Sequence, residues 1–356
     1  MLLVFIAFIS LMSLIITHEL GHFLLAKKFG IKVEEFGIGY PPRIYGKKVG
    51  ETIYSLNLLP FGAFVRIFGH EERIDHPRSF SNKPIWQRAL VILGGVVSFW
   101  IVAAILLTLV MALGVPSIIN DSDAIGFSEP KVQIIAIASN SPAASAKLEV
   151  GDTITKIGGV ETNKVIEVQD FIKENKGKEI ALTVQRGKNI FDVNVVPRSI
   201  VPEGEGALGV GLVRTGLISY SWYEAPIKGI VATGNLTVMI LDGWKTALTS
   251  IFGGKGVPQG MEVRGIVGIF DLFVRSGELG ATYFLQFVAI ASVSIALLNV
   301  MPIPALDGGW FVLLMIEAIR KKPLNEKIER GINAFFFFLL LILMVLVTIK
   351  DIIRIF

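Results

Sequence analysis

The chain has 356 residues, of which 52% are hydrophobic and 18% charged, and its mean hydropathy is +0.63. Charged residues average about 25% in soluble domains, so charge here must lie outside long apolar segments. This composition excludes a disordered chain, a disulfide scaffold and a simple cytosolic enzyme. The absence of cysteine excludes thiolate catalysis and cysteine-ligated zinc. A net charge of +4 favours membrane-flanking loops over a nucleic-acid surface, so we expect no nucleic-acid partner.

Four apolar segments predict a polytopic α-helical membrane protein with four transmembrane helices. We place them at 1–28, 89–115, 283–316 and 333–355. Each segment is long enough to cross ~30 Å of hydrocarbon. The first could instead be a signal peptide, but it lacks a basic start and a small-residue cleavage site. The third contains Pro302 and Pro304, so we expect its helix to be broken.

The loops differ in charge, and this difference predicts their orientation. Residues 27–88 hold 11 Lys and Arg against 6 Asp and Glu, and residues 317–332 hold 5 against 3. The long loop 116–282 holds 16 against 18. The positive-inside rule therefore places the long loop and both termini outside the cytoplasm.

The long loop has the pattern of an inserted α+β module. We place this module at 116–215 with a core at 124–197, and a linker with an amphipathic surface helix at 216–282. Alternating apolar residues and glycine-centred turns predict short strands and hairpins within the core. The strands are expected at 131–137, near 154, at 180–185 and at 191–196, and the helices after Ser141 and at 168–175.

The run from Ser141 to Val160 resembles a bacterial, circularly permuted PDZ domain. In such domains a peptide C-terminus adds as a strand to a sheet edge, and backbone N–H groups hold its carboxylate. The resemblance implies that Ile125, Gly126 and Phe127 form the carboxylate-binding loop. The alternative is a small β-rich spacer that binds no ligand.

The first span contains the run His18-Glu19-Leu20-Gly21-His22 among otherwise uncharged residues. Histidines at i and i+4 share one helix face, so both imidazoles can reach one metal ion. Glu19 lies about 100° further round the helix, near enough to accept a proton from a water molecule at the metal. Zinc is favoured because neutral imidazole nitrogen suits it. The alternative is a set of polar groups that only links helices.

A catalytic zinc usually has three protein ligands, and without cysteine the third must be His, Asp or Glu. We favour Asp307, which follows the two prolines of the third span, and interpret His70 and His76 as residues of a polar loop. Unwound backbone is tolerated at membrane depth only against protein or a water-filled cavity, so an aspartate there needs a partner. The alternative is that Asp307 only caps a helix.

The HExxH run and the later Asn299-x-x-Pro-x-Pro-x-Leu-Asp307-Gly run together resemble the site-2 protease family of intramembrane zinc metalloproteases. The likeness is closest to the bacterial regulator-of-sigma-E branch, which has PDZ domains between the second and third spans. It implies one zinc ion held by His18, His22 and Asp307, with Glu19 as general base. Asn299 would position the substrate or stabilise the oxyanion, unless it only makes an interhelical hydrogen bond. The resemblance also implies the bacterial inner membrane, with the PDZ module on the extracytoplasmic side.

Residues 29–88 extend the resemblance. The stretches 36–40 and 54–65 alternate like strands and are too apolar for an ordinary loop. The family has a membrane re-entrant β-hairpin here that offers an edge strand to the substrate, which implies that Gly37 and Gly39 contact it. The alternative is a small sheet that only rests on the bilayer. In one departure, Ser98 stands where many relatives carry an asparagine, so we give it no catalytic role.

The sequence therefore predicts an enzyme in the lipid bilayer that cleaves single-pass membrane proteins within or near their membrane-spanning segment. The resemblance implies substrates of the anti-sigma-factor or remnant-signal-peptide kind, shortened beforehand by another protease. The PDZ module would test whether the substrate's ectodomain has been removed. Two other classes remain: a metal-binding membrane protein such as a transporter, and a scaffold that uses the PDZ module alone.

Overall fold

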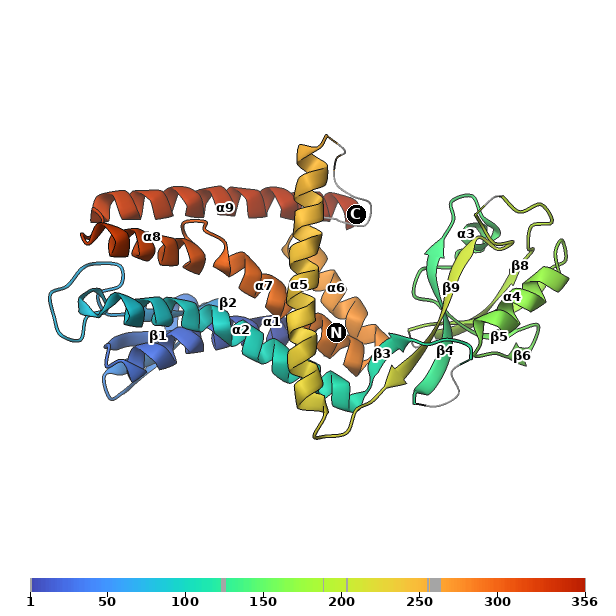
Figure 1. The fold of residues 1–356 in the computed structure, drawn as a ribbon, viewed down its shortest axis with the longest axis horizontal. Coiled ribbons are helices and arrows are strands. Elements are labelled where there is room, and N and C mark those ends of the chain that lie inside the picture. Colours follow the sequence, from blue (N-terminus) through green and yellow to red (C-terminus); the bar gives the residue numbers. More distant parts are fainter. Residues whose placement is uncertain are drawn as a thin grey trace. The chain divides into compact units, whose positions relative to one another are not determined.

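A computed structural model describes residues 2–122, 126–187, 189–202, 204–254, 256 and 264–355 (Figure 1). Its α-helices are α1 (Leu2–Lys28), α2 (Ile85–Leu113), α3 (Pro142–Ser145), α4 (Val165–Glu174), α5 (Ala225–Phe252), α6 (Ile266–Leu279), α7 (Ala281–Val300), α8 (Asp307–Arg320) and α9 (Glu326–Ile355). Its strands are β1 (Val33–Val49), β2 (Thr52–Ile67), β3 (Val115–Ile118), β4 (Ser128–Ile137), β5 (Thr153–Ile157), β6 (Val160–Glu161), β7 (Ile180–Arg186), β8 (Asn189–Val195) and β9 (Val210–Ile218).

The chain divides into two compact units. The first comprises Met1–Thr108, Pro226–Gly277 and Phe284–Phe356, and the second comprises Leu109–Ala225 and Glu278–Tyr283. The first unit holds most of the apolar helices and the β1–β2 sheet, and the second holds the remaining strands with α3 and α4.

Four helices among the described residues are long and apolar enough to cross a membrane: α1, α2, α7 and α9. Three of them coincide with predicted spans, although α2 and α9 begin earlier in the chain than expected, at Ile85 and Glu326, and α7 covers only the first part of the third predicted span, 283–316. Helix α5 packs on α2, and Trp100 Nε1 of α2 donates to Thr237 Oγ1 of α5 at 3.1 Å. Its predicted position on the membrane surface stays a prediction.

Helices α1 and α2 approach each other at small residues. A Cβ on Gly21 would lie 2.3 Å from the carbonyl oxygen of Gly94, and a Cβ on Gly94 would lie 2.5 Å from Leu25 Cδ1. Between apolar helices in lipid, such glycines allow the backbones to make close van der Waals contact. The contact sets the HExxH turn of α1 directly against the middle of α2.

The third predicted span, 283–316, is interrupted between Val300 and Asp307. Residues 301–306 form turns, in which Ala305 has a φ of 75°. A Cβ on Gly309 would lie 2.2 Å from the carbonyl oxygen of Ile303, so only glycine lets α8 begin this close to the turn. The interruption makes Asp307 the first residue of a new helix, which agrees with the two prolines read from the sequence.

Strands β1 and β2 form one antiparallel sheet in which both strands bend back. Residues 35–38 of β1 pair with 53–56 of β2 on one side and with 63–66 on the other, while residues 43–49 extend the pairing beyond 52–57. One edge of the sheet is therefore the last part of β2. Val65 and Ile67, in this part, pack against the buried cluster that includes Phe23 of α1. That the sheet enters the membrane stays a prediction.

The second unit is a sheet with strand order β3-β9-β4-β5-β7-β8, with β6 beside β5. Helix α4 packs on it through Val168 and Ile172, which share a buried core with Ile154 and Leu182. Strands β4, β5, β7 and β8 and helices α3 and α4 form in the segments where we predicted them. Strands β3 and β9 were not predicted, and they extend the sheet beyond the predicted core of 124–197.

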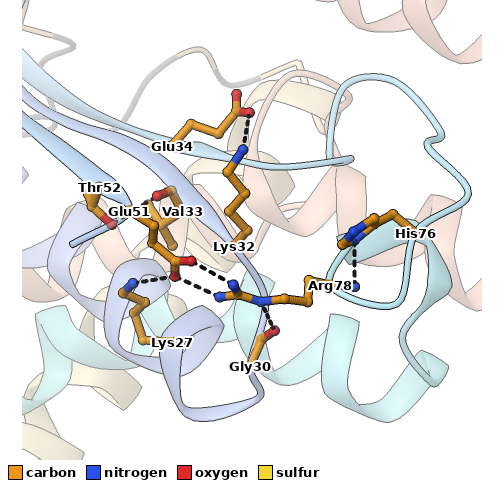
Figure 2. Close-up of polar contacts among 9 residues, drawn as sticks. All are labelled: Lys27, Gly30, Lys32, Val33, Glu34, Glu51, Thr52, His76 and Arg78. Carbon is orange, nitrogen blue, oxygen red and sulfur yellow. Dashed lines mark hydrogen bonds and ion pairs between the residues drawn. The ribbon is translucent and has the colours of Figure 1, made fainter. Parts of the chain in front are cut away.

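Glu51, in the turn between β1 and β2, joins the end of α1 to the loop that follows β2 (Figure 2). Its carboxylate accepts from Arg78 and from Lys27, each at 2.7 Å. Arg78 also donates to the carbonyl oxygen of Gly30 at 3.4 Å. Hydrogen bonds from Arg78 and, to a smaller extent, from Lys27 lower the pKa of Glu51 to about 2.

We expect Glu51→Gln to lower the midpoint of thermal unfolding at pH 7 by about 2 °C or less, because exposed ion pairs stabilise weakly. The folded-state pKa of Glu51 lies below its ordinary value of 4.5, so this stabilisation is lost as the pH falls from about 4.5 to about 2. The difference between wild type and variant should therefore shrink over that range, measured by thermal denaturation of the detergent-solubilised protein. Glu34→Gln, whose carboxylate meets Lys32 at 3.4 Å (Figure 2), is the control that should change little. If the stability difference between wild type and Glu51→Gln did not change with pH, the lowered pKa of Glu51 would be contradicted.

Candidate metal centre and active site

Two imidazoles of α1 converge at one point. The Nε2 atoms of His18 and His22, one helical turn apart, are separated by 3.3 Å. His22 Nδ1 lies 2.8 Å from the carbonyl oxygen of Val91 on α2, so this nitrogen donates and Nε2 carries the free lone pair. The ring of His18 stacks on Phe99 of α2 with a centroid distance of 4.9 Å. Helix α2 thus orients both rings.

Asp307 approaches the two imidazoles from the start of α8. Its Oδ2 lies 3.3 Å from His18 Nε2 and 3.5 Å from His22 Nε2. Within the described part of the chain, these three residues are the one group of His, Asp or Glu side chains whose ligand atoms lie within 4.8 Å of one another. The structure therefore brings together the three residues that the sequence assigned to the metal.

The three residues fit a zinc ion. Zinc bonds of about 2.0–2.2 Å at tetrahedral angles separate the ligand atoms by about 3.3–3.5 Å, which matches the distances between His18, His22 and Asp307. Asp307 Oδ2 is buried and makes no hydrogen bond with any group that the structure describes. A buried carboxylate oxygen without a donor is costly unless a cation satisfies it.

Gly95 of α2 provides the space that the imidazoles occupy. A Cβ at this position would lie 2.2 Å from His22 Nε2 and 2.7 Å from His18 Cε1. Ser98, one turn further along α2, donates to the carbonyl oxygen of Gly95 at 2.6 Å and is thereby engaged with its own helix. Any side chain larger than hydrogen at position 95 would displace the two histidines.

A cavity of about 170 Å³ lies beside these three residues. Glu19 lines it, and the Glu19 carboxylate lies beside the backbone of Val65 in β2. The volume is sufficient for several water molecules, each of which takes about 30 Å³ in the liquid. A carboxylate in this position can accept a proton from a water molecule that attacks a bound carbonyl group. The other lining residues are Val65, Ile67, His70, Val91, Ile92, Ala305 and Trp310.

Asn299 lies in the last turn of α7. Its Nδ2 donates to the carbonyl oxygen of Ile295 in the same helix at 2.9 Å, and it is not among the residues that line the described cavity. This bond engages one N–H of the Asn299 amide within α7. Its role in positioning substrate or stabilising an oxyanion stays a prediction.

Gly37 lies inside the bent sheet, not at its edge. Gly37 pairs with Ser55 on one side and with Phe64 on the other, because β2 bends back along β1. Gly39 has a φ of 77°, a backbone conformation that glycine adopts without strain. The strand that reaches the cavity is β2, through Val65. Substrate contact by the two glycines stays a prediction.

Of the predicted carboxylate-binding loop, Ile125 lies outside the described residues, and Gly126 and Phe127 precede β4. The ring of Phe127 packs against the guanidinium group of Arg214 at 5.0 Å. The groove of about 310 Å³ beside α4 is formed by other residues, because β9 and not β4 is the strand next to this helix. It is lined by Gln169, Ile172, Lys173, Lys176, Val201, Glu205, Gly206, Ala207, Leu208, Val210 and Leu212.

His70, which we interpreted as an ordinary loop residue, lines the cavity beside His18, His22 and Asp307. Its ring lies 4.8 Å from the ring of Phe80 in the same loop and 4.8 Å from Trp310 of α8. His76 is exposed, and its Nδ1 accepts from the backbone N–H of Arg78 at 3.1 Å (Figure 2). No local sequence signal separates the two histidines, because the difference arises only when the loop packs on α8.

We expect Gly95→Ala to weaken zinc binding about 10- to 100-fold, because the added methyl group overlaps both imidazoles. The measurement is the zinc affinity of the purified protein in competition with a chelator. Gly234→Ala in α5 is the matched control, since a Cβ there meets no atom within 4 Å. Equal zinc affinities of Gly95→Ala and wild type would contradict the geometry described above.

Comparison with known proteins gives matches along nearly the whole chain. Residues 6–343 match Peptidase family M50. A Clostridium perfringens protein named as zinc metalloprotease CPE1693 is 37% identical over 352 residues, covering 98% of this chain and 97% of its own. The regulator of sigma-W protease RasP of Bacillus subtilis is 28% identical over 435 residues, covering 99% of this chain and 98% of its own.

Among solved structures, the PDZ domain of an SdrC-like protein from Listeria monocytogenes matches 26% of this chain and 92% of its own, with 23% identity and a TM-score of 0.21. The family match and the relatives both span the HExxH run and Asp307. Together with the four apolar helices, they establish a membrane-integral enzyme. The chain belongs to Peptidase family M50, the site-2 protease family, and is a zinc metalloprotease.

Proposed function

We propose that this metalloprotease cleaves single-pass membrane proteins within or next to their membrane-spanning segments, with one zinc ion held by His18, His22 and Asp307. The observation that carries the proposal is the place of the HExxH run inside α1, one of the four helices apolar enough to cross a membrane. The cavity beside it is walled by residues of α1, α2, α8 and β2. A site built among such helices can meet peptide bonds that are themselves in the bilayer.

Glu19 is the general base in this proposal. It accepts a proton from the attacking water molecule and later gives it to the leaving nitrogen, so that the peptide C–N bond breaks with release of an amine. A bound zinc ion supplies Lewis-acid chemistry, which polarises the scissile carbonyl group and makes water more acidic. Val91 and Phe99 keep the two imidazoles oriented, and the apolar walls of the cavity limit access of bulk water.

The edge of β2 is the site at which we propose that the substrate is held. A membrane-spanning helix must be locally extended before hydrolysis, because its backbone groups are bonded to one another. Residues 63–67 form an outer strand of the bent sheet, and Val65 lies beside Glu19. A substrate segment that adds as a strand along this edge would bring a peptide bond to the catalytic carboxylate.

The charge distribution supports an orientation in the inner membrane of a bacterium. The positive loops 27–88 and 317–332 would face the cytoplasm, and the near-neutral segment 116–282 would lie outside it. One relative is named for regulating sigma-W, which supports substrates of the anti-sigma-factor kind. Remnant signal peptides are a second class with the same single-pass architecture.

The groove between α4 and β9 supports binding of a peptide C-terminus by the second unit. Strand β3 pairs with β9 over Thr215–Ile218, and no described strand pairs with the same edge from Val210 to Val213. Lys173 and Lys176 add positive charge beside this edge. The occupant would be the new C-terminus that another protease leaves when it shortens a substrate's ectodomain.

We expect Glu19→Gln to lower cleavage of a synthetic membrane-spanning peptide by about 10²–10⁴-fold, because the amide cannot accept the proton. Zinc content should stay at the wild-type level, since Glu19 is not among the three proposed ligands. The measurement is product formation by purified protein in lipid vesicles, with a chelator-treated sample for comparison and Glu34→Gln as the matched control. Undiminished cleavage by Glu19→Gln would sink the proposal.

For the groove, we expect a six-residue peptide ending in valine to bind the full chain at least about 10-fold more tightly with a free carboxylate than as its amide. Lys176→Glu should remove this preference, because it reverses charge beside the groove. Lys131 lies away from the groove, so Lys131→Glu should leave the preference for the free carboxylate unchanged. Fluorescence anisotropy measures all three, and equal binding of acid and amide would overturn peptide-end recognition.

A further inference from the structure

Two side chains that can donate hydrogen bonds line the catalytic cavity besides the metal group: His70 and Trp310. The remaining lining residues, apart from Glu19, are apolar: Val65, Ile67, Val91, Ile92 and Ala305. Glu19 can supply a base but, when ionised, no donor. Any donor that a reacting carbonyl oxygen meets from a described side chain of this cavity is therefore His70 or Trp310.

The ring of His70 is packed against two aromatic rings. Phe80 contacts it edge-on with a centroid distance of 4.8 Å and an interplanar angle of 75°, and Trp310 lies at 4.8 Å on α8. The backbone N–H of His70 donates to the carbonyl oxygen of Ile67 at 3.2 Å, which closes the turn after β2. A donor held this firmly needs little reorganisation when charge develops beside it.

The loop that carries His70 is itself anchored by ion pairs. Arg73, three residues later, lies 3.4 Å from Glu317 of α8, and Glu317 also pairs with the buried Arg88 of α2 at 2.7 Å. His70 lines the small cavity of about 30 Å³ beside these charges as well as the catalytic one. The imidazole is thus held between a rigid charged layer and the reaction site.

His70 is not one of the clustered metal-binding groups. The described ligand atoms within 4.8 Å of one another belong to His18, His22 and Asp307. Burial lowers the pKa of His70 to about 4, so the ring is neutral at pH 7 and keeps one N–H. A neutral donor in an apolar cavity avoids the desolvation cost of a second cation beside the metal.

We propose that His70 is a catalytic residue that donates a hydrogen bond to the oxyanion formed during peptide hydrolysis. When the water oxygen bonds to the carbonyl carbon, the π electrons of the C=O bond move to its oxygen, and the water proton goes to Glu19. Collapse of the tetrahedral intermediate restores the C=O bond and breaks the C–N bond, and the leaving nitrogen takes the proton from Glu19. The His70 N–H keeps its proton throughout and acts only on the charge of the oxygen. Trp310 positions the imidazole from α8.

The inference needs only peptide hydrolysis in this cavity and not the membrane-embedded substrates proposed above. Its test compares His70→Phe, which keeps a ring between Phe80 and Trp310, with His70→Gln, which restores an N–H donor. We expect His70→Phe to lower kcat about 10²-fold with little change in KM, and His70→Gln to recover part of this loss. His76→Phe is the control and should match wild type.

Two further measurements separate catalysis from structure. Affinity for a phosphinic analogue of the cleaved peptide, whose tetrahedral group carries the negative charge, should fall in His70→Phe in parallel with kcat/KM. Zinc content should equal that of wild type. Loss of zinc in His70→Phe would make His70 a metal ligand, and an unchanged kcat would make it a packing residue; either overturns the proposal. If wild type binds the analogue but leaves membrane-spanning peptides intact, the proposed substrate class fails while the test of His70 still stands.

Discussion

The structure depends on placing ionisable groups among apolar helices. On insertion scales a charged residue at the centre of a membrane-spanning helix costs ~2.5–3.5 kcal/mol. Here two imidazoles of α1 and a carboxylate of α8 meet at 3.3–3.5 Å. If a cation joins them as proposed, the three groups act as one structural unit. The helix contacts, the interrupted segment and the covering sheet all serve this convergence.

Bringing the groups together requires helix backbones that approach closely and a helix, α7, that ends before Asp307. Gly21 lets α1 contact α2, and Gly95 leaves the two imidazoles the volume of a missing side chain. The turn at 301–306 then delivers Asp307 at the N-terminus of α8, where its carboxylate faces the imidazoles. In an unbroken helix Asp307 would lie in the helix interior and not at an N-terminus. The prolines that break the helix therefore also position Asp307.

The sequence predicted what is local and missed what arises from distant contacts. His18, Glu19 and His22 were evident because a helix of known period fixes their relative directions. Asp307 followed from the proline break and the absence of cysteine. Strand β9 was missed because its partners, β3 and β4, lie about 70 to 100 residues earlier in the chain, and a local hydrophobic pattern does not identify a distant partner strand. His70 was missed for the same reason: its place on the cavity depends on α8.

One face of α2 contacts both α1 and α8. Arg88, Val91, Gly95 and Phe99 follow one another at intervals of three or four residues and therefore lie along one side of the helix. In order, they pair with Glu317 of α8, hold His22, leave space for both imidazoles and support the ring of His18. A shift of α2 by one residue would rotate this face by about 100° and remove all four contacts together. The register of α2 therefore fixes the proposed metal ligands through one end of this face and the position of α8 through the other. Assembly of the active site and packing of the helices are thus the same physical event.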